Sequence, residues 1–194
     1  MPAQNLQLAI IIGSTREGRW GDKVAHWFAD EARRRADLLV DVVDLAEVDI
    51  PAVLAMRHTP EVQAYAERID RADAFVVVTP EYNHSYPASL KQAIDVLNAP
   101  WRRKPVAFVS YGGLSGGLRA VEHLRQVFAE LHATTIRETV SLHRHPLLFD
   151  ESGALVEPSG PAEAAKVMLD DLVWWASALR TARDAEVADL TWIE

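Results

Sequence analysis

The chain has 194 residues, 49% hydrophobic and 25% charged, and a chain of this kind can enclose a core without disulfides or metal ions. It contains no cysteine, which excludes disulfide scaffolds, thiolate catalysis and Cys-ligated metal centres. Its 28 acidic and 20 basic side chains give a formal net charge of -8, which disfavours contact with the phosphate backbone of nucleic acids.

Five short apolar segments predict strands. The first, Leu6 to Ile12, stops at a glycine, and because no basic residues precede it and no cleavage-like site follows it, it indicates a strand rather than a signal peptide. The later candidates are Leu38 to Val43, Ala74 to Val78, Val106 to Ser110 and Thr135 to Leu142. No apolar stretch approaches the roughly 20 residues of a membrane helix, so we expect no membrane span. The absence of cysteine suits a cytoplasmic location.

Helical patterns separate most of these strands. Apolar residues recur at helical spacing in three places: Val24, Trp27, Phe28 and Ala32; Leu90, Ile94 and Leu97; and Leu118, Val121, Leu124, Phe128 and Leu131. A last helix is predicted with Pro161 at its first position, Glu163 in its first turn and apolar residues from Val167 to Leu179. We expect this helix to cover one face of the sheet.

Alternating strands and helices predict an α/β fold, a three-layer sandwich around a five-stranded parallel sheet of order 2-1-3-4-5. We find no repeat or linker, so residues 1–194 are expected to form one domain. The irregular stretch from Asp44 to Thr59 is interpreted as a long functional or interface loop rather than a domain boundary.

In such a sheet a ligand lies beyond the carboxyl ends of the strands, where the winding reverses. The first segment at this edge, residues 13–21, leads from strand one into a helix. Ser14 and Thr15 offer hydroxyls, Arg16 and Arg19 offer charge, and the helix start offers free N–H donors. The segment lacks the Walker and GxGxxG patterns, so it suits a phosphate monoester best. The alternative is an exposed turn rich in helix-starting residues.

The second and third segments follow strands three and four. In the second segment, residues 79–87, two prolines stiffen a loop whose backbone amides can match the pyrimidine edge of a flavin. The third segment, residues 110–117, has four glycines between Gly112 and Gly117, which allow close backbone approach to a ligand. The alternative for the third segment is a plain connector.

The run from Pro80 to Asp95 resembles the PEYNxSxPxxLKNAID signature of the NADPH-dependent FMN reductase family, flavodoxin-like proteins that include quinone, azo-compound and chromate reductases. Only Gln92 departs from it, where Asn is usual. The resemblance extends in matching order from about Leu6 to about Leu142.

The resemblance implies a flavodoxin-like fold that holds FMN and passes a hydride from NADPH or NADH to a small acceptor such as a quinone, flavin or azo compound. Ser14, Arg16 and Arg19 would hold the phosphate, Pro80 to Asn83 would line the isoalloxazine, and residues near Gly112 would close the pocket. The full set of expected cofactor-binding residues is Ser14, Thr15, Arg16, Arg19, Trp20, Gly21, Pro80, Glu81, Tyr82, Asn83, Ser110, Tyr111, Gly112 and Gly113. The family also implies a homodimer or a tetramer of dimers, with the partner subunit bordering the flavin.

Two other functions fit the same residues. A flavodoxin-type electron carrier would bind FMN without oxidising nicotinamide, and a regulatory module would keep the fold without the flavin. Flavodoxins usually carry a Ser/Thr-rich phosphate loop, whereas the first segment has two arginines.

Three remaining motifs have simple interpretations. His143 to Pro146 is a weak metal signal, so we interpret it as a solvated strand end and predict no metal site. Trp101 to Lys104 is interpreted as a solvated turn, with the 2'-phosphate of NADPH as the alternative ligand. Trp174 and Trp175 are expected in the core or in a dimer interface.

Overall fold

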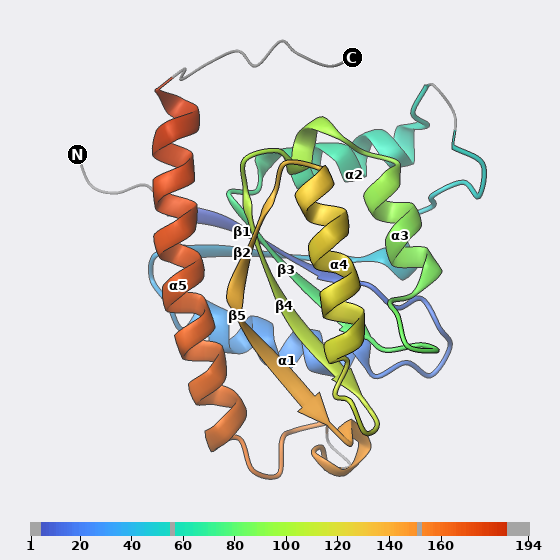
Figure 1. Cartoon of the computed structure of the whole chain (residues 1–194), viewed down its shortest axis with the longest axis vertical. Coiled ribbons are helices and arrows are strands. Elements are labelled where there is room, and N and C mark those ends of the chain that lie inside the picture. The colour runs from blue at the N-terminus through green and yellow to red at the C-terminus, as the bar shows by residue number, and fades with distance from the viewer. Residues whose placement is uncertain (1–4, 55–56, 151–152, 186–194) are drawn as a thin grey trace.

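The computed structural model describes residues 5–54, 57–150 and 153–185, and its centre is a sheet of five parallel strands (Figure 1). The strands are β1 (Leu6–Ile12), β2 (Leu38–Asp44), β3 (Ala74–Pro80), β4 (Pro105–Gly112) and β5 (Thr134–His143). They lie in the order β2-β1-β3-β4-β5, which confirms the predicted order. Because all neighbouring pairs are parallel, the carboxyl ends of β1, β3 and β4 lie at the same edge of the sheet.

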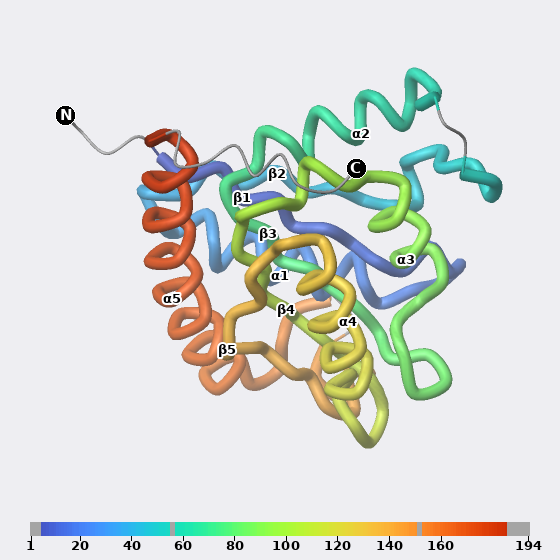
Figure 2. The backbone as a smooth tube through the Cα atoms, turned by 45° about the horizontal axis from the view of Figure 1, so that its top comes forward, coloured from blue at the N-terminus to red at the C-terminus, as the bar shows by residue number. Residues whose placement is uncertain are grey.

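Helices cover both faces of the sheet and make three layers (Figures 1 and 2). They are α1 (Gly21–Arg33), α2 (Pro60–Arg71), α3 (Ala88–Asp95), α4 (Leu118–Glu130) and α5 (Ser159–Asp184), with single 3₁₀ turns at Leu45–Glu47, Ala99–Trp101 and His145–Leu147. The α1 and α5 helices pack on one face, and α2, α3 and α4 pack on the other. Among the described residues no helix is both long and apolar enough to cross a membrane.

The strands bury side chains on both faces. Ile10 of β1 and its neighbour Val76 of β3 face the α1 and α5 layer, whereas Ile11 and Val77 face the other three helices. All seven residues of β3 are buried. A strand covered on both faces reads as a continuous apolar run, which explains why β1 and β3 were predictable within a few residues.

Helix boundaries differ from the predictions in two places. The α5 helix begins at Ser159, so Pro161 is its third residue and Glu163 lies beyond its first turn. The α2 helix is not among those predicted from apolar spacing, although Thr59 caps it through a 3.3 Å bond to the amide of Val62 and Pro60 is its first residue. On α5, Trp175 packs against the core while Trp174 is 63% exposed.

The pairing of β4 with the edge strand β5 contains an irregularity. Val106 pairs with Thr135 and Phe108 pairs with Thr139, so Ala107 alone lies opposite the stretch 136–138. Arg125 of α4 donates to two carbonyls of this stretch, at 2.6 Å to Ile136 and 3.3 Å to Arg137. A helix side chain therefore satisfies backbone groups that the ladder leaves free.

Candidate functional site

The three predicted segments meet at one edge of the sheet. The Ser14 hydroxyl lies 2.7 Å from the Tyr82 hydroxyl, which joins the first segment to the second. The amide of Glu81 donates to the Tyr111 carbonyl at 3.2 Å, which joins the second segment to the third. The predicted convergence is confirmed, and it follows from the adjacency of β1, β3 and β4.

The two arginines of the first segment have different surroundings. Arg16 is exposed and forms no ion pair with any described residue, and its guanidinium carbon lies 6.0 Å from the centre of the Tyr82 ring. Arg19 forms an ion pair with Asp44 at the end of β2, and both side chains are less than one-fifth exposed. Arg16 therefore brings to the pocket a positive charge that no described carboxylate compensates, whereas Arg19 joins the first segment to β2.

Trp20 and Gly21 form the start of α1. Trp20 is the residue before the first helical position, and Gly21 is buried beside Tyr111 of β4. A Cβ atom on Gly21 would lie 2.9 Å from the Tyr111 hydroxyl, closer than packing allows. A side chain at Gly21 would therefore displace the Tyr111 ring.

The second segment ends in a tight turn. Tyr82 and Ser85 exchange two backbone hydrogen bonds of 2.8 and 3.1 Å, and the residues between them, Asn83 and His84, have φ values of 49° and 75°. Positive φ at both central positions is the geometry of a type I′ turn, in which Asn is well tolerated. The turn fixes the direction in which Tyr82 and Asn83 leave the end of β3.

The Glu81 carboxylate connects the second segment to the third segment and to α4. Its side chain is 5% exposed and accepts hydrogen bonds from the Ser115 hydroxyl at 2.7 Å and from Nε of Arg119 at 2.6 Å. Burial raises the pKa of Glu81, but the bonds from Ser115 and Arg119 outweigh it and hold this pKa below its usual value. The carboxylate is therefore engaged within the protein.

A pocket of about 580 Å³ lies between the first two segments and the start of α3. Five of its lining residues were predicted: Thr15, Arg16, Glu81, Tyr82 and Asn83. The others are Pro87, Ala88 and Ser89, where α3 begins. The free amides at a helix start attract anions and polar ligand atoms. Because Pro87 marks the start of α3 in the sequence, it could have indicated that these three residues line the pocket.

The third segment is fixed by residues beneath and beside it. The buried Ser110 donates from its hydroxyl to the Gly116 carbonyl at 2.8 Å, and Ser141 of β5 donates to the same carbonyl at 2.9 Å. Gly112 is buried, whereas Gly113 is exposed and a Cβ there would meet no atom within 4 Å. Gly113 is the position at which this segment can approach a ligand.

Residues after β5 contact the third segment, which corrects one interpretation. His145 is only partly exposed, and its Nδ1 lies 3.1 Å from the Gly112 carbonyl oxygen. His143 lies 3.0 Å from the Leu114 carbonyl oxygen through its own Nδ1. The interpretation of this motif as a solvated strand end is therefore wrong for His145. Within the described ranges no group of three or more His, Asp or Glu residues is placed to hold a metal ion.

The motif from Trp101 to Lys104 lies at the opposite edge of the sheet, before β4 begins. Trp101 is fully buried, and Lys104 is 6% exposed with its ammonium donating to the carbonyls of Ile69 and Asp70 at 3.1 and 2.6 Å. A solvated turn was the wrong interpretation for these two residues. Their position is at the opposite end of the strands from the three predicted segments.

The residues at the carboxyl edge fit a phosphorylated flavin. Two buried polar atoms there, the Tyr111 hydroxyl and Nε of Arg19, have no hydrogen-bond partner among the described residues. Both are donors, and burial raises the pKa of Tyr111, which keeps its hydroxyl protonated. Together with the unpaired Arg16, they suit the oxygens of a phosphate monoester.

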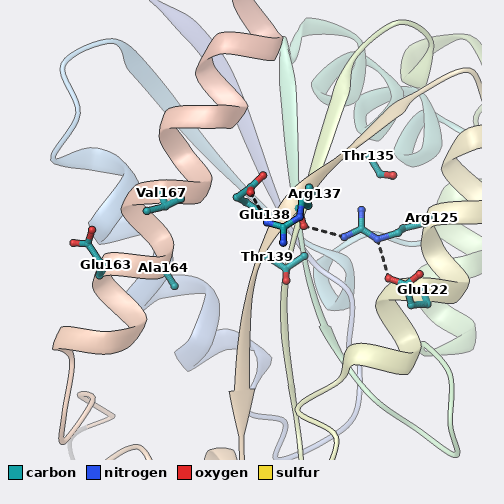
Figure 3. A pocket seen from close by; sticks show the side chains of 9 residues that line it. All are labelled: Glu122, Arg125, Thr135, Arg137, Glu138, Thr139, Glu163, Ala164 and Val167. Carbon is teal, nitrogen blue, oxygen red and sulfur yellow. Dashed lines mark hydrogen bonds and ion pairs between the residues drawn. The ribbon is translucent and has the colours of Figure 1, made fainter.

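A second, larger pocket of about 840 Å³ lies over β5 between α4 and α5 (Figure 3). Its lining includes Glu122 and Arg125 of α4 and Glu138 of β5, and Arg125 pairs with Glu122 at 3.0 Å. None of the three predicted segments contributes to it. Both arginines of the lining are engaged, Arg125 with Glu122 and two strand carbonyls and Arg137 with Glu138, so this pocket offers an anionic cofactor no unpaired guanidinium among the described residues.

The chain is similar in sequence to known proteins. The model of a family described as NADPH-dependent FMN reductase matches residues 6–146. An NAD(P)H-dependent FMN reductase of Schizosaccharomyces pombe is 37% identical over 120 residues, which cover 57% of this chain and 60% of the relative. A quinone reductase of Escherichia coli K12 is 34% identical over 143 residues, which cover 70% and 76% of the two chains.

Solved structures support the fold. A flavoenzyme NAD(P)H:(acceptor) oxidoreductase from Paracoccus denitrificans superposes with a TM-score of 0.72 at 21% identity and covers 89% of this chain and 98% of its own. A flavodoxin of Streptococcus pneumoniae gives a TM-score of 0.58 at 20% identity over 86% of this chain and 97% of its own. At these identities the likeness concerns the flavodoxin-like arrangement of sheet and helices.

Proposed function

The chain belongs to the NADPH-dependent FMN reductase family, and we propose that it binds one FMN and transfers a hydride from NAD(P)H through it to a small electron acceptor. The observation that carries the proposal is the edge where the three segments meet. It combines a pocket, an arginine that pairs with no described residue, and two buried donors that have no partner in the described part of the chain. The names of the relatives point to quinones and flavins as the class of acceptor.

The first segment would bind the phosphate. The positive charge of Arg16 would compensate the phosphate charge, and the hydroxyls of Ser14 and Thr15 would donate to its oxygens. Arg19, held by Asp44, would present Nε from one side, and the Tyr111 hydroxyl would donate from beneath. These groups orient the ligand by its charged end.

The second and third segments would hold the ring. The backbone N–H groups of Asn83 and Gly113 would face the polar edge of the isoalloxazine, because those of Glu81 and Tyr82 already donate to the Tyr111 and Ser85 carbonyls. The Tyr82 side chain would form a wall of the pocket. When bound, FMN supplies the redox chemistry by taking a hydride from NAD(P)H and giving electrons to the acceptor. The protein's part is then to leave one ring face open to both substrates in turn.

The proposal extends to assembly and location. Leu114 of the third segment and Leu147 of the 3₁₀ turn after β5 are 85% and 75% exposed, and apolar side chains at the rim of a site favour a partner surface. We propose a homodimer or a tetramer of dimers with the partner bordering the flavin, and a cytoplasmic location, where reduced nicotinamide is available. Light scattering after gel filtration would measure the assembly.

The visible absorbance spectrum of the purified protein, recorded anaerobically, tests the function. We expect a flavin spectrum that bleaches on addition of NADPH or NADH and returns when a quinone is added. An electron carrier of the flavodoxin type would show the flavin spectrum without bleaching. A colourless protein that leaves added FMN unbound would contradict the proposal, because nothing else in the site supplies a redox group.

A further inference from the structure

Three consecutive residues at the end of β5, His143 to His145, contact the carbonyls of the third segment. His143 Nδ1 lies 3.0 Å from the Leu114 oxygen, the amide of Arg144 donates to Gly113 at 2.8 Å, and His145 Nδ1 lies 3.1 Å from the Gly112 oxygen. A carbonyl oxygen can only accept, so both Nδ1 atoms carry the proton. The exit from β5 thus runs along the third segment and bonds three successive carbonyls.

His145 also reaches the first segment. Its ring meets the Trp20 ring edge to face at 5.6 Å and 76°, and it meets the Tyr111 ring in the same manner at 5.1 Å and 69°. Trp20 immediately precedes α1, and the Tyr111 hydroxyl lies beside Gly21. One side chain therefore connects the phosphate-binding segment, the end of β4 and the third segment.

The His145 ring is neutral near pH 7. Burial lowers the pKa of His145, and the bond to the Gly112 carbonyl only partly offsets this effect. A neutral ring with its proton on Nδ1 makes this bond and leaves Nε2 without a proton. The contact is therefore an ordinary hydrogen bond between neutral groups, whose removal has a modest and measurable effect.

The third segment needs such support because of its composition. Its four glycines give it many accessible conformations, and ordering them when a ligand binds opposes binding. Gly116 and Gly117 have φ values of 62° and 86°, and a Cβ on Gly116 would lie within 2.6 Å of the His143 ring. The conformation that exposes Gly113 is thus set by contacts from β5 and the residues after it.

We propose that His145 is a positioning residue for the cofactor. By donating from Nδ1 to the Gly112 carbonyl, it holds the third segment in the shape that receives FMN before FMN arrives. This inference rests on the proposed function, because it assigns His145 a role toward the same ligand. His145 is not expected to touch the reacting atoms.

Two substitutions distinguish the contribution of the His145 hydrogen-bond donor from that of its aromatic ring. His145→Phe keeps an aromatic ring for Trp20 and Tyr111 but removes the donor, whereas His145→Asn keeps a donor near Nδ1 and removes the ring. We expect His145→Phe to weaken FMN binding by the apoprotein roughly five- to tenfold, as for the loss of one neutral hydrogen bond. We expect His145→Asn to bind at least threefold more tightly than His145→Phe, an order-of-magnitude estimate on the same basis.

FMN fluorescence quenching measures the affinity, and circular dichroism checks that each variant folds. The matched control is His26→Phe, because His26 also bonds a backbone carbonyl through Nδ1, that of Asp22 at 2.7 Å, but on the exposed face of α1. Its FMN affinity should stay unchanged. Equal affinity of His145→Phe and wild type, or equal weakening in the Phe and Asn variants, would overturn the inference while FMN binding itself stands.

A measurement on the wild type keeps the inference testable if His145→Phe does not fold. Nitrogen NMR of the histidine rings at pH 7 should show His145 with a protonated Nδ1 and a bare Nε2. A proton on Nε2 alone would exclude the bond to Gly112 and overturn the inference. If the wild-type protein does not bind FMN, the proposed function is wrong. That result differs from both tests of the inference, the affinities of the variants and the protonation of the His145 ring.

Discussion

Replacing Arg16 by alanine should weaken FMN binding more than the same replacement at any other arginine that the structure describes. Arg16 is exposed at the pocket and forms no ion pair with a described residue, so its charge is available to a ligand. Arg19, in contrast, is committed to Asp44. The two arginines should therefore differ in their contribution to FMN affinity, because only Arg19 has a carboxylate partner among the described residues.

The expected size comes from the kind of bond that is lost. A hydrogen bond between a guanidinium and a phosphate contributes about 1.5–3 kcal/mol, which corresponds to a roughly 10- to 150-fold change in the FMN dissociation constant. Because Arg16 is at the surface, we expect the lower half of this range, and the effect should shrink at high salt. Riboflavin, which has the same ring but no phosphate, should bind the variant and the wild type equally.

The assay is a titration of apoprotein with FMN and with riboflavin, followed by fluorescence quenching. Arg33→Ala is the control, since it removes the same charge from the last turn of α1, where Arg33 is 50% exposed and pairs with Asp30 at 3.1 Å. An unchanged FMN affinity in Arg16→Ala, or an equal loss for riboflavin, would refute the placement of the phosphate at the first segment.

Three further variants test interactions of the site framework and of the opposite edge of the sheet. Tyr82→Phe removes the 2.7 Å bond to Ser14 and should lower the free energy of unfolding by about 1 kcal/mol in urea denaturation, with Ser14→Ala adding little in the double variant. Glu81→Gln should lower it by about 2 kcal/mol at pH 7, because Arg119 loses its buried partner. The pKa of Glu81 is lowered by folding, so this difference should persist above about 4.5 and disappear as the pH falls through the lower folded value. Burial lowers the pKa of Lys104 from 10.5 to about 8. The free energy of unfolding of the wild type should therefore rise relative to that of Lys104→Met as the pH increases from about 8 to 10.5. Parallel pH profiles of the two proteins would contradict this.

The sequence was sufficient for the fold and for the edge where the site lies. Strands buried on both faces appear as apolar runs, and the residues that follow β1, β3 and β4 carry the glycines, prolines and hydroxyls of a binding edge. The match from Pro80 to Asp95 added the cofactor. These features are local in the chain, which is why they could be read from it.

Contacts that depend on register could not be predicted. Asp44 reaches Arg19 because Ile12 pairs with Asp44 across β1 and β2, and no local pattern gives that alignment. In the same way His143 lies opposite Gly112 only after the irregular stretch of β5 has shifted the register. The contacts of Asp44 and His145 therefore became visible only with the strands in place.

The hydrogen bonds from Arg125 to the irregular stretch of β5 have a consequence for the molecule in concentrated solution. An outermost strand with free carbonyls is a template onto which another chain can add a strand, and growth of this kind leads to aggregates. The guanidinium occupies the acceptors at Ile136 and Arg137, and the distorted backbone there no longer matches a regular partner. One helix side chain thereby protects this border of the sheet against unwanted self-association.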